Sequence, residues 1–256
     1  MLIDIHAHLT DKRYGGDTQK LVNNFSQKRV GLVVDAGYDL RSSSLAYDNA
    51  EKYTQIYATL GVHPEKPYEY DGNFEKFLIE KSESEKVIAI GEIGLDYHYD
   101  GYDKDLQREV FEKQITLADK LKLPIVVHSR DCSSDMLSVL TDNKKYLNNG
   151  FLMHCYSESK ETAKKYLDLG AYFSFGGVIT FKNSKKDEIV KSIPIDRVLT
   201  ETDCPYLTPH PHRGETNYPE MVELVYAKLC DIFNIDFESL EKVVESNAKT
   251  LFKKLK

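Results

Sequence analysis

The 256-residue chain has a formal net charge of −7 and 41% hydrophobic residues, which is typical of a folded globular protein and excludes a disordered one. The acidic balance also excludes a broadly basic surface that would bind a long polyanion by charge alone. The longest apolar runs have strand length, far short of the roughly 20 residues that span a bilayer. No basic segment precedes a long apolar stretch at the start, so we expect no membrane span and a cytoplasmic location.

Eight short apolar runs rich in β-branched residues alternate with amphipathic stretches. The runs cover residues 2–6, 31–36, 56–62, 87–91, 125–128, 151–154, 171–175 and 197–200. Among the amphipathic stretches, 104–121 has apolar residues at spacings of three and four, which predicts a helix. Eight strand-then-helix units predict an α/β fold of the TIM-like (β/α)8 barrel type. An open doubly wound sheet is the competing fold, but it usually has fewer strands and a glycine-rich loop after the first strand, which this sequence lacks.

The last part of the chain adds two features to the barrel. An extra C-terminal helix is expected to begin near Asp236 and to pack on the barrel exterior. The segment 205–219, rich in Pro and His, follows the eighth strand and is expected to be an irregular functional loop. The sequence has no internal repeat, low-complexity tract or linker-like change of composition, so residues 1–256 are expected to form a single domain.

Cysteine usage does not point to a site. The four cysteines are widely spaced without a CxxC pair, which argues against a zinc ribbon and against a disulfide framework. We interpret them as small buried side chains without a functional role. They are Cys132, Cys155, Cys204 and Cys230.

The first predicted strand ends in His6-Ala7-His8. Because alternate side chains of a strand share a face, both rings can reach one cation. Two such histidines can equally be surface residues, so other strand ends must supply further ligands. In a barrel the carboxyl ends of all strands meet at one mouth, and metal-competent side chains also lie at the ends of strands four, five, six and eight. The six candidate ligands are His6, His8, Glu92, His128, His154 and Asp203.

Six ligands are too many for one tetrahedral zinc ion and suit two divalent ions with a bridging carboxylate. The economical division assigns His6, His8 and Asp203 to one ion, and His128 and His154 to the other. Glu92 would bind both. Two divalent ions, two carboxylates and a hydroxide leave a local charge of about +1, which favours an anionic reaction centre such as phosphate. Nitrogen and oxygen ligands of this kind accept Zn, Mn, Mg, Fe or Ni, so the metal identity stays open.

The chain contains the motifs MLIDIHAHL, GVHP, GEIGLDYH, PIVVHSRD, HCY, SFGG, RVLTETDCPYL and HRGETNYP. Together they resemble the TatD family of metal-dependent deoxyribonucleases, within the amidohydrolase-like metallohydrolases. The resemblance implies a TIM-like barrel, two divalent ions on the six ligands named above, and hydrolysis of phosphodiester bonds, often as a 3′ to 5′ exonuclease. The implied partner is DNA, single-stranded or at 3′ ends, with neither a membrane nor an obligate protein partner. Glu92 stands where many amidohydrolases carry a carboxylated lysine, and this is the TatD pattern.

The expected roles of the side chains follow from this chemistry. Asp203 is expected to accept a proton from the attacking water as general base, and Glu92 is the second catalytic residue. Four further side chains fall on family motif positions around the site and are candidates for substrate binding. Of these, His63 and Arg130 are expected to bind phosphate oxygens. They are His63, Arg130, Tyr156 and Arg213.

Several of these assignments have structural alternatives. His63 can instead make a structural hydrogen bond, and Arg130 can form an ion pair with Asp131 or Asp96. Glu201 can bind metal or orient a ligand, and we favour the second role.

Two other functions compete with the nuclease. The same dinuclear centre can hydrolyse an ester or amide, for example an aminoacyl ester on RNA. A non-catalytic metal-binding scaffold is disfavoured, because structural zinc sites fill every position with protein ligands. Among the 17 tyrosines, four lie where they can line a cleft and stack on bases. These are Tyr97, Tyr99, Tyr102 and Tyr156.

Overall fold

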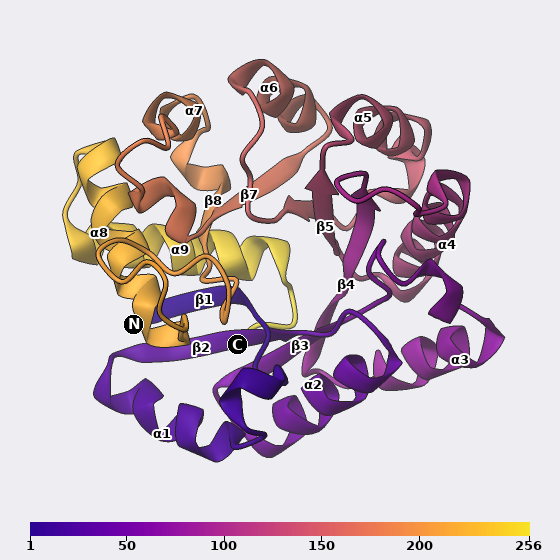
Figure 1. Cartoon of the computed structure of the whole chain (residues 1–256), viewed down its shortest axis with the longest axis horizontal. Helices are drawn as coiled ribbons and strands as arrows, with labels where there is room; N and C mark the ends of the chain where they lie inside the picture. The colour runs from indigo at the N-terminus through magenta and orange to yellow at the C-terminus, as the bar shows by residue number, and fades with distance from the viewer.

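The computed structural model describes residues 1–256, apart from the side chain of Ser26. Eight parallel strands form one sheet in the order in which they occur along the chain, and helices surround it (Figure 1). The strands are β1 (Leu2–Ala7), β2 (Val30–Ala36), β3 (Ile56–Leu60), β4 (Val87–Asp96), β5 (Ile125–Arg130), β6 (Phe151–Met153), β7 (Ala171–Phe175) and β8 (Val198–Thr200). The α-helices are α1 (Thr18–Gln27), α2 (Leu40–Lys52), α3 (Gly72–Lys81), α4 (Lys104–Leu121), α5 (Ser133–Asp142), α6 (Lys160–Asp168), α7 (Asp187–Lys191), α8 (Val222–Phe233) and α9 (Phe237–Leu251).

The first and last strands meet and nearly close the sheet into a barrel. Ala7 forms a parallel bridge with Cys204, and the amide of His8 donates to the Cys204 carbonyl at 2.8 Å. The amide of Asp203 donates to the carbonyl of His6 at 3.0 Å. The TIM-like (β/α)8 fold predicted from the sequence is therefore confirmed.

The strands are buried because helices cover the outside of the barrel while side chains fill its interior. Strand β4 shows this most clearly, since all ten of its residues are buried. The prediction ended this strand at Gly91, and that is wrong: the strand continues through Glu92 to Asp96. The expected ends of β3 and β6 are also wrong in the other direction, because these strands stop at Leu60 and Met153.

The helix predicted over 104–121 is confirmed as α4. The Asp103 side chain accepts a hydrogen bond from the amide of Leu106 at its start, and Lys122 ends it in the left-handed conformation. Its buried face includes Val110, Phe111 and other apolar residues, as the spacing predicts.

The extra C-terminal helix is also confirmed. Helix α9 starts directly after Asp236, whose side chain accepts from the amide of Ser239. The helix packs against β1, β8 and α8. The amide of the buried Asn247 donates to the carbonyls of Ile195 and Val198, both at 2.8 Å, and so fixes the start of β8.

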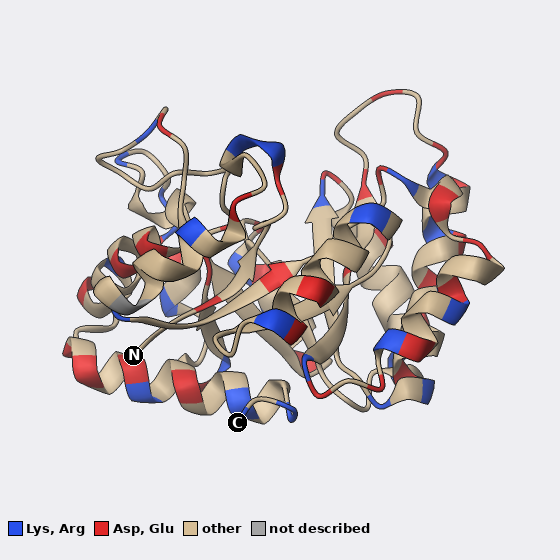
Figure 2. Ribbon diagram, turned by 90° about the horizontal axis from the view of Figure 1, so that it is seen from below, with Lys and Arg blue, Asp and Glu red and all other residues tan. Residues whose placement is uncertain are grey.

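Charged residues of both signs are interspersed over the helices and loops (Figure 2). This distribution agrees with the modest net charge of −7. In the part of the chain that the structure describes, no helix is both long enough and apolar enough to cross a membrane.

The segment 205–219 is irregular, as predicted, until the short 3-10 helix η6 (Pro219–Met221). It follows β8 and therefore lies at the mouth, where the other loops after strands also lie.

Candidate metal centre

The six predicted ligands converge at the carboxyl ends of the strands. His6 belongs to β1, Glu92 to β4 and His128 to β5. His8 and His154 directly follow β1 and β6, and Asp203 lies three residues after the end of β8. Side-chain nitrogen and oxygen atoms in three groups of residues lie within 4.8 Å of one another. The groups are His6, His8 and Asp203; His6, Glu92 and His154; and His63, Glu92 and His128.

Glu92 lies between two sets of imidazoles and is 3% exposed. Its Oε2 is 3.4 Å from Nε2 of His6 and 3.7 Å from Nε2 of His8. Its Oε1 is 2.8 Å from Nε2 of His154 and 2.8 Å from Nδ1 of His128. The two oxygens of this carboxylate thus face different imidazole pairs.

Asp203 faces the first of these pairs. Its Oδ1 is 3.3 Å from Nε2 of His8 and 3.9 Å from Nε2 of His6. Its backbone is in the left-handed region, with φ +53°, a conformation that costs a non-glycine residue about 1 kcal/mol or more. Neighbouring contacts must therefore hold this turn.

Two buried polar side chains hold the turn at Asp203. Asp4 accepts from the amide of Thr202 at 2.9 Å and from its hydroxyl at 2.6 Å. The amide of Asn217 donates to the carbonyl of Thr202 at 2.9 Å and to that of Tyr206 at 2.6 Å. These contacts fix the residues on both sides of Asp203, so the direction of its carboxylate depends on them.

The rings of the histidines are oriented through their second nitrogen atoms. Nδ1 of His8 pairs with the carbonyl of Ala36 at 3.0 Å, which leaves Nε2 to face the carboxylates. Nε2 of His128 pairs with Oδ2 of Asp96 at 2.9 Å, which leaves Nδ1 to face Glu92.

Glu201, for which we favoured an orienting role, lies beside the ring of His154. It is fully buried, accepts from the hydroxyl of Ser174, and has Oε1 3.6 Å from Nδ1 of His154. The opposite nitrogen of His154 faces Glu92.

The contact of Asp96 with the ring of His128 was not predicted, because Asp96 was considered only as a partner of Arg130. The register offers a signal for it: Gly94 pairs with His128 across β4 and β5, so a side chain near the end of β4 lies beside that imidazole.

The histidines of the centre lower the pKa values of the two carboxylates, Glu92 and Asp203. Burial acts to raise the pKa of Glu92, but the charges of His154 and His63 and a hydrogen bond with His128 lower it well below its usual range. Burial likewise acts to raise the pKa of Asp203, and a hydrogen bond with His8 outweighs it. Both carboxylates are therefore ionised at neutral pH.

The same contacts favour protonated histidines in the metal-free protein. Burial acts to lower the pKa of His8, but Asp203 and Glu92 raise it to about 9. The pKa of His154 is raised well above its usual value by Glu92 and Glu201, against the effect of burial. A divalent cation would replace these protons, because it supplies positive charge to the same carboxylates.

The donor set fits divalent ions. Both ring nitrogens of the fully buried His6 lack a hydrogen-bond partner among the described residues, and the ring stacks on His154 with centroids 4.1 Å apart. Unpartnered buried nitrogens beside a carboxylate are costly unless a cation uses them. Imidazole and carboxylate ligands suit Zn, Mn, Fe or Ni, and carboxylate oxygens also suit Mg.

His63, a candidate for substrate binding, lies beside two of the predicted ligands, Glu92 and His128. Its Nε2 is 3.5 Å from Oε1 of Glu92. Its Nδ1 accepts from the amide of Glu65 at 3.2 Å, and burial together with the charge of His128 lowers its pKa. The neutral ring then carries its proton on Nε2, so it can donate toward the centre while also making the structural hydrogen bond considered above.

Arg130 is exposed, and its guanidinium carbon lies 5.5 Å from the centre of the Tyr99 ring. The two carboxylates considered as its partners contact other groups: Asp96 pairs with His128, and Asp131 pairs with Nδ1 of His98 at 2.8 Å.

The other two substrate-binding candidates lie in different surroundings. Tyr156 is 5% exposed, and its hydroxyl donates to the carbonyl of Ser159 at 2.6 Å, so its observed contacts are structural. Arg213 is exposed in the loop 205–219, with its guanidinium carbon 3.8 Å from the centre of the Phe181 ring.

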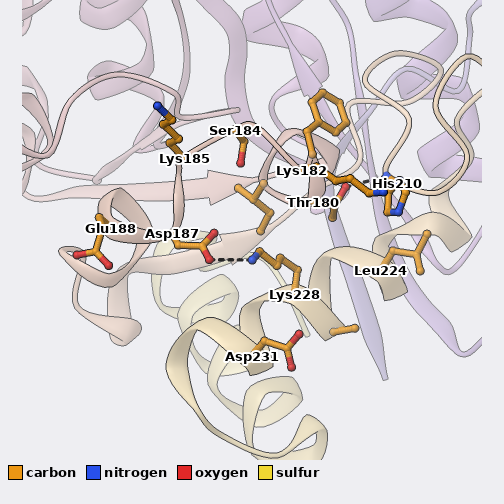
Figure 3. Close-up of a pocket in the computed structure, with 13 residues that line it drawn as sticks. Thr180, Lys182, Ser184, Lys185, Asp187, Glu188, His210, Leu224, Lys228 and Asp231 are labelled. Atoms are coloured by element: carbon orange, nitrogen blue, oxygen red, sulfur yellow. Dashed lines mark hydrogen bonds and ion pairs between the residues drawn. The ribbon is translucent and has the colours of Figure 1, made fainter.

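A separate hollow of about 520 Å³ lies between α8 and the segment after β7 (Figure 3). Lys228 and Asp187 form an ion pair across it at 2.8 Å. Three lysines and three carboxylates line it, so their charges balance, and its lining residues do not include the six ligands. These charged residues are Lys182, Lys185, Lys228, Asp187, Glu188 and Asp231.

Comparison with known proteins agrees with this centre. Residues 3–253 match the family model described as TatD related DNase. The chain belongs to the TatD family. Its relatives in the family include YabD of Bacillus subtilis, described as an uncharacterized metal-dependent hydrolase, at 41% identity over 99% of both chains. YcfH of Escherichia coli, described in the same words, is 34% identical over 98% of this chain and 95% of its own.

Solved structures support the same assignment. The crystal structure of YjjV, a TatD homologue from Escherichia coli, has a TM-score of 0.91 at 28% identity and covers 98% of both chains. An organophosphorus hydrolase from Deinococcus radiodurans shares the fold, with a TM-score of 0.66 at 12% identity over 98% of this chain and 92% of its own. This TatD-family protein is therefore a metal-dependent hydrolase.

Proposed function

We propose that this protein hydrolyses phosphodiester bonds in DNA, removing nucleotides from a 3′ end, and that its six ligands hold two divalent ions. One observation carries the proposal: the two oxygens of Glu92 face two different pairs of imidazoles. A centre of this kind has positive charge where a phosphodiester is negative, although the chain as a whole is acidic. The family description supports DNA as the substrate.

Each side chain of the centre has a role in this reaction. The ions supply Lewis-acid stabilisation of the phosphate and a lowered pKa of water. Asp203 is ionised and lies at the centre, so it accepts the proton of the attacking water. His63 donates from Nε2 to a phosphate oxygen, and Arg130 supplies a second, charged donor at the mouth.

Glu201 and Asp96 hold the rings of His154 and His128, so that their ligand nitrogens stay aimed at Glu92. The ligands come from β1 through the turn after β8, so we propose that residues 1–256 form one catalytic domain.

The test measures the release of labelled nucleotide from a 3′-labelled single-stranded oligonucleotide, with Zn, Mn, Mg, Fe or Ni added to metal-free protein. Glu92→Gln and Asp203→Asn should lower the rate by about 100-fold or more, the size of a lost acid–base group. Glu241→Gln is the matched control, because Glu241 is also buried but pairs with Arg29 at 2.8 Å and with the N-terminus. Full activity in both centre variants would refute the centre.

A second assay separates the nuclease from an esterase. The same preparations are incubated with an aminoacyl ester of RNA and with a lactone. Rapid ester turnover with intact DNA would refute the nuclease while keeping the hydrolase.

A further inference from the structure

Three exposed tyrosines surround the mouth of the barrel. Tyr68 is 68% exposed, Tyr99 51% and Tyr206 43%, and among the described residues they are the exposed tyrosines. They lie in the loops that follow β3, β4 and β8. Loops that follow barrel strands lie at the mouth, so these rings are on the same face of the barrel as the candidate ligands.

Tyr206 is fixed in place beside a ligand of the centre. Its ring centroid lies 6.0 Å from that of His8. The guanidinium carbon of Arg13 lies 4.2 Å from the centre of the tyrosine ring. Asp11 holds both residues: its oxygens accept from Nε and Nη2 of Arg13 at 3.0 and 3.2 Å, and from the hydroxyl of Tyr206 at 3.3 Å.

A similar pair lies on the opposite side of the barrel. Arg130 lies 5.5 Å from the ring centre of Tyr99, which also contacts the ring of His98. The amide of His98 donates to Asp96 at 2.9 Å, and Asp96 pairs with the ligand His128. In the sheet order β1 to β8, strands β4 and β5 lie across the barrel from the joined β1 and β8, as Figure 1 shows. The centre is therefore flanked by two arginine–tyrosine pairs.

We propose that Tyr206 with Arg13, and Tyr99 with Arg130, form two stacking sites that hold nucleobases on either side of the cleaved phosphodiester. This inference rests on the proposed function. Tyrosine rings and guanidinium planes both stack on bases, and every base has a face to offer.

The charges fit a stacking role better than simple charge attraction. Asp11 neutralises Arg13, so this pair contributes a flat surface with little net charge. Such a surface can hold nucleotides on a protein with a net charge of −7, which has no broad basic groove to offer.

The test compares a single-stranded thymidine oligonucleotide with one of equal length in which the two nucleotides at the 3′ end lack bases. Binding is measured by fluorescence anisotropy on metal-free protein, and kcat/KM is measured with added metal. The wild-type protein should bind the complete oligonucleotide about 100-fold more tightly than the abasic one, because two stacked bases are lost at about tenfold each.

Variants of Tyr206 test whether its ring causes the preference for the complete oligonucleotide. Tyr206→Leu should lower it about tenfold, whereas Tyr206→Phe, which keeps the ring, should retain it. Tyr146→Leu is the matched control: Lys145 lies 4.7 Å from the centre of the Tyr146 ring, but this pair is in the 3-10 helix η3 (Lys144–Tyr146), before β6 and away from the mouth. It should keep the wild-type preference.

The two proposals fail in different ways. An unchanged preference for bases in Tyr206→Leu, or equal binding of both oligonucleotides by the wild type, would overturn the stacking sites even if DNA is cleaved. A clear base preference without cleavage would leave the stacking sites standing and overturn the nuclease.

Discussion

Replacing Asn217 by alanine should disable the centre without touching a ligand. The side chain is fully buried, and its amide donates to the carbonyls of Thr202 and Tyr206. These residues bracket Asp203, whose backbone is in the left-handed region. Without the amide, the turn can relax, and the carboxylate then moves away from His8.

The structure gives the size of the effect. Two buried hydrogen bonds contribute about 1 kcal/mol each, and the carbonyls left without a donor add to the loss, so the free energy of unfolding should fall by about 2–3 kcal/mol. Residues that orient a ligand typically affect metal affinity or activity by about 10–100-fold. We expect a loss of kcat/KM in that range, measured on a 3′-labelled oligonucleotide, with unfolding measured by urea denaturation in the presence of a chelator.

Asn247→Ala separates lost stability from lost positioning. This asparagine is also buried and also donates to two backbone carbonyls, but it fixes the start of β8 rather than the turn after it. Its replacement should lower stability by a similar amount and keep kcat/KM close to that of the wild type. Equal losses of activity in the two variants would refute the assignment of Asn217 as a positioning residue.

Three further outcomes are expected. Removing metal with a chelator should lower Tm by roughly 10 °C, since a ligand at 1,000 times its Kd stabilises by about 4 kcal/mol; Glu92→Gln should shrink this shift, and an unchanged wild-type Tm would argue against the centre. Burial raises the pKa of Asp35 from 3.8 to about 6, although Asn49 and the amide of Leu9 act to lower it. The folded state then binds this proton more tightly than the unfolded state, so stability should fall by about 2 kcal/mol from pH 4.5 to 7.5. Urea unfolding of Asp35→Asn should lack this part of the decline, and the prediction fails if the two pH profiles are parallel. Gly94→Ala should prevent stable folding, because a Cβ there would lie 2.0 Å from the carbonyl oxygen of His128, whereas Gly72→Ala, with open space around it, should leave Tm unchanged or slightly raised.

Sequence periodicity was enough to predict the order of the strands, the limits of α4 and the start of the C-terminal helix near Asp236. It failed at the end of β4, because Glu92 is a charged residue inside a buried strand. Such a residue is tolerated only because imidazoles from other strands surround it. A local pattern cannot show partners that come from elsewhere in the chain.

The candidate ligands could be found from the sequence because a barrel brings all strand ends to one mouth. The side chains that orient them could not. Asn217 and Asp4 act on Thr202 across 15 and 198 residues of sequence. The left-handed turn at Asp203 has no glycine to mark it, so only the tertiary contacts reveal it.

The joining of β1 to β8 sets when the protein can first act during its synthesis. His6 leaves the ribosome early, but the turn with Asp203 follows almost at the end of the barrel, and the two meet through the hydrogen bond between the Asp203 amide and the His6 carbonyl. At about 5–20 residues per second, the interval between them is roughly 10–40 s. An incomplete chain carries His6, His8 and Glu92 without Asp203, so the candidate metal centre is complete only after the last strand of the barrel has joined the first.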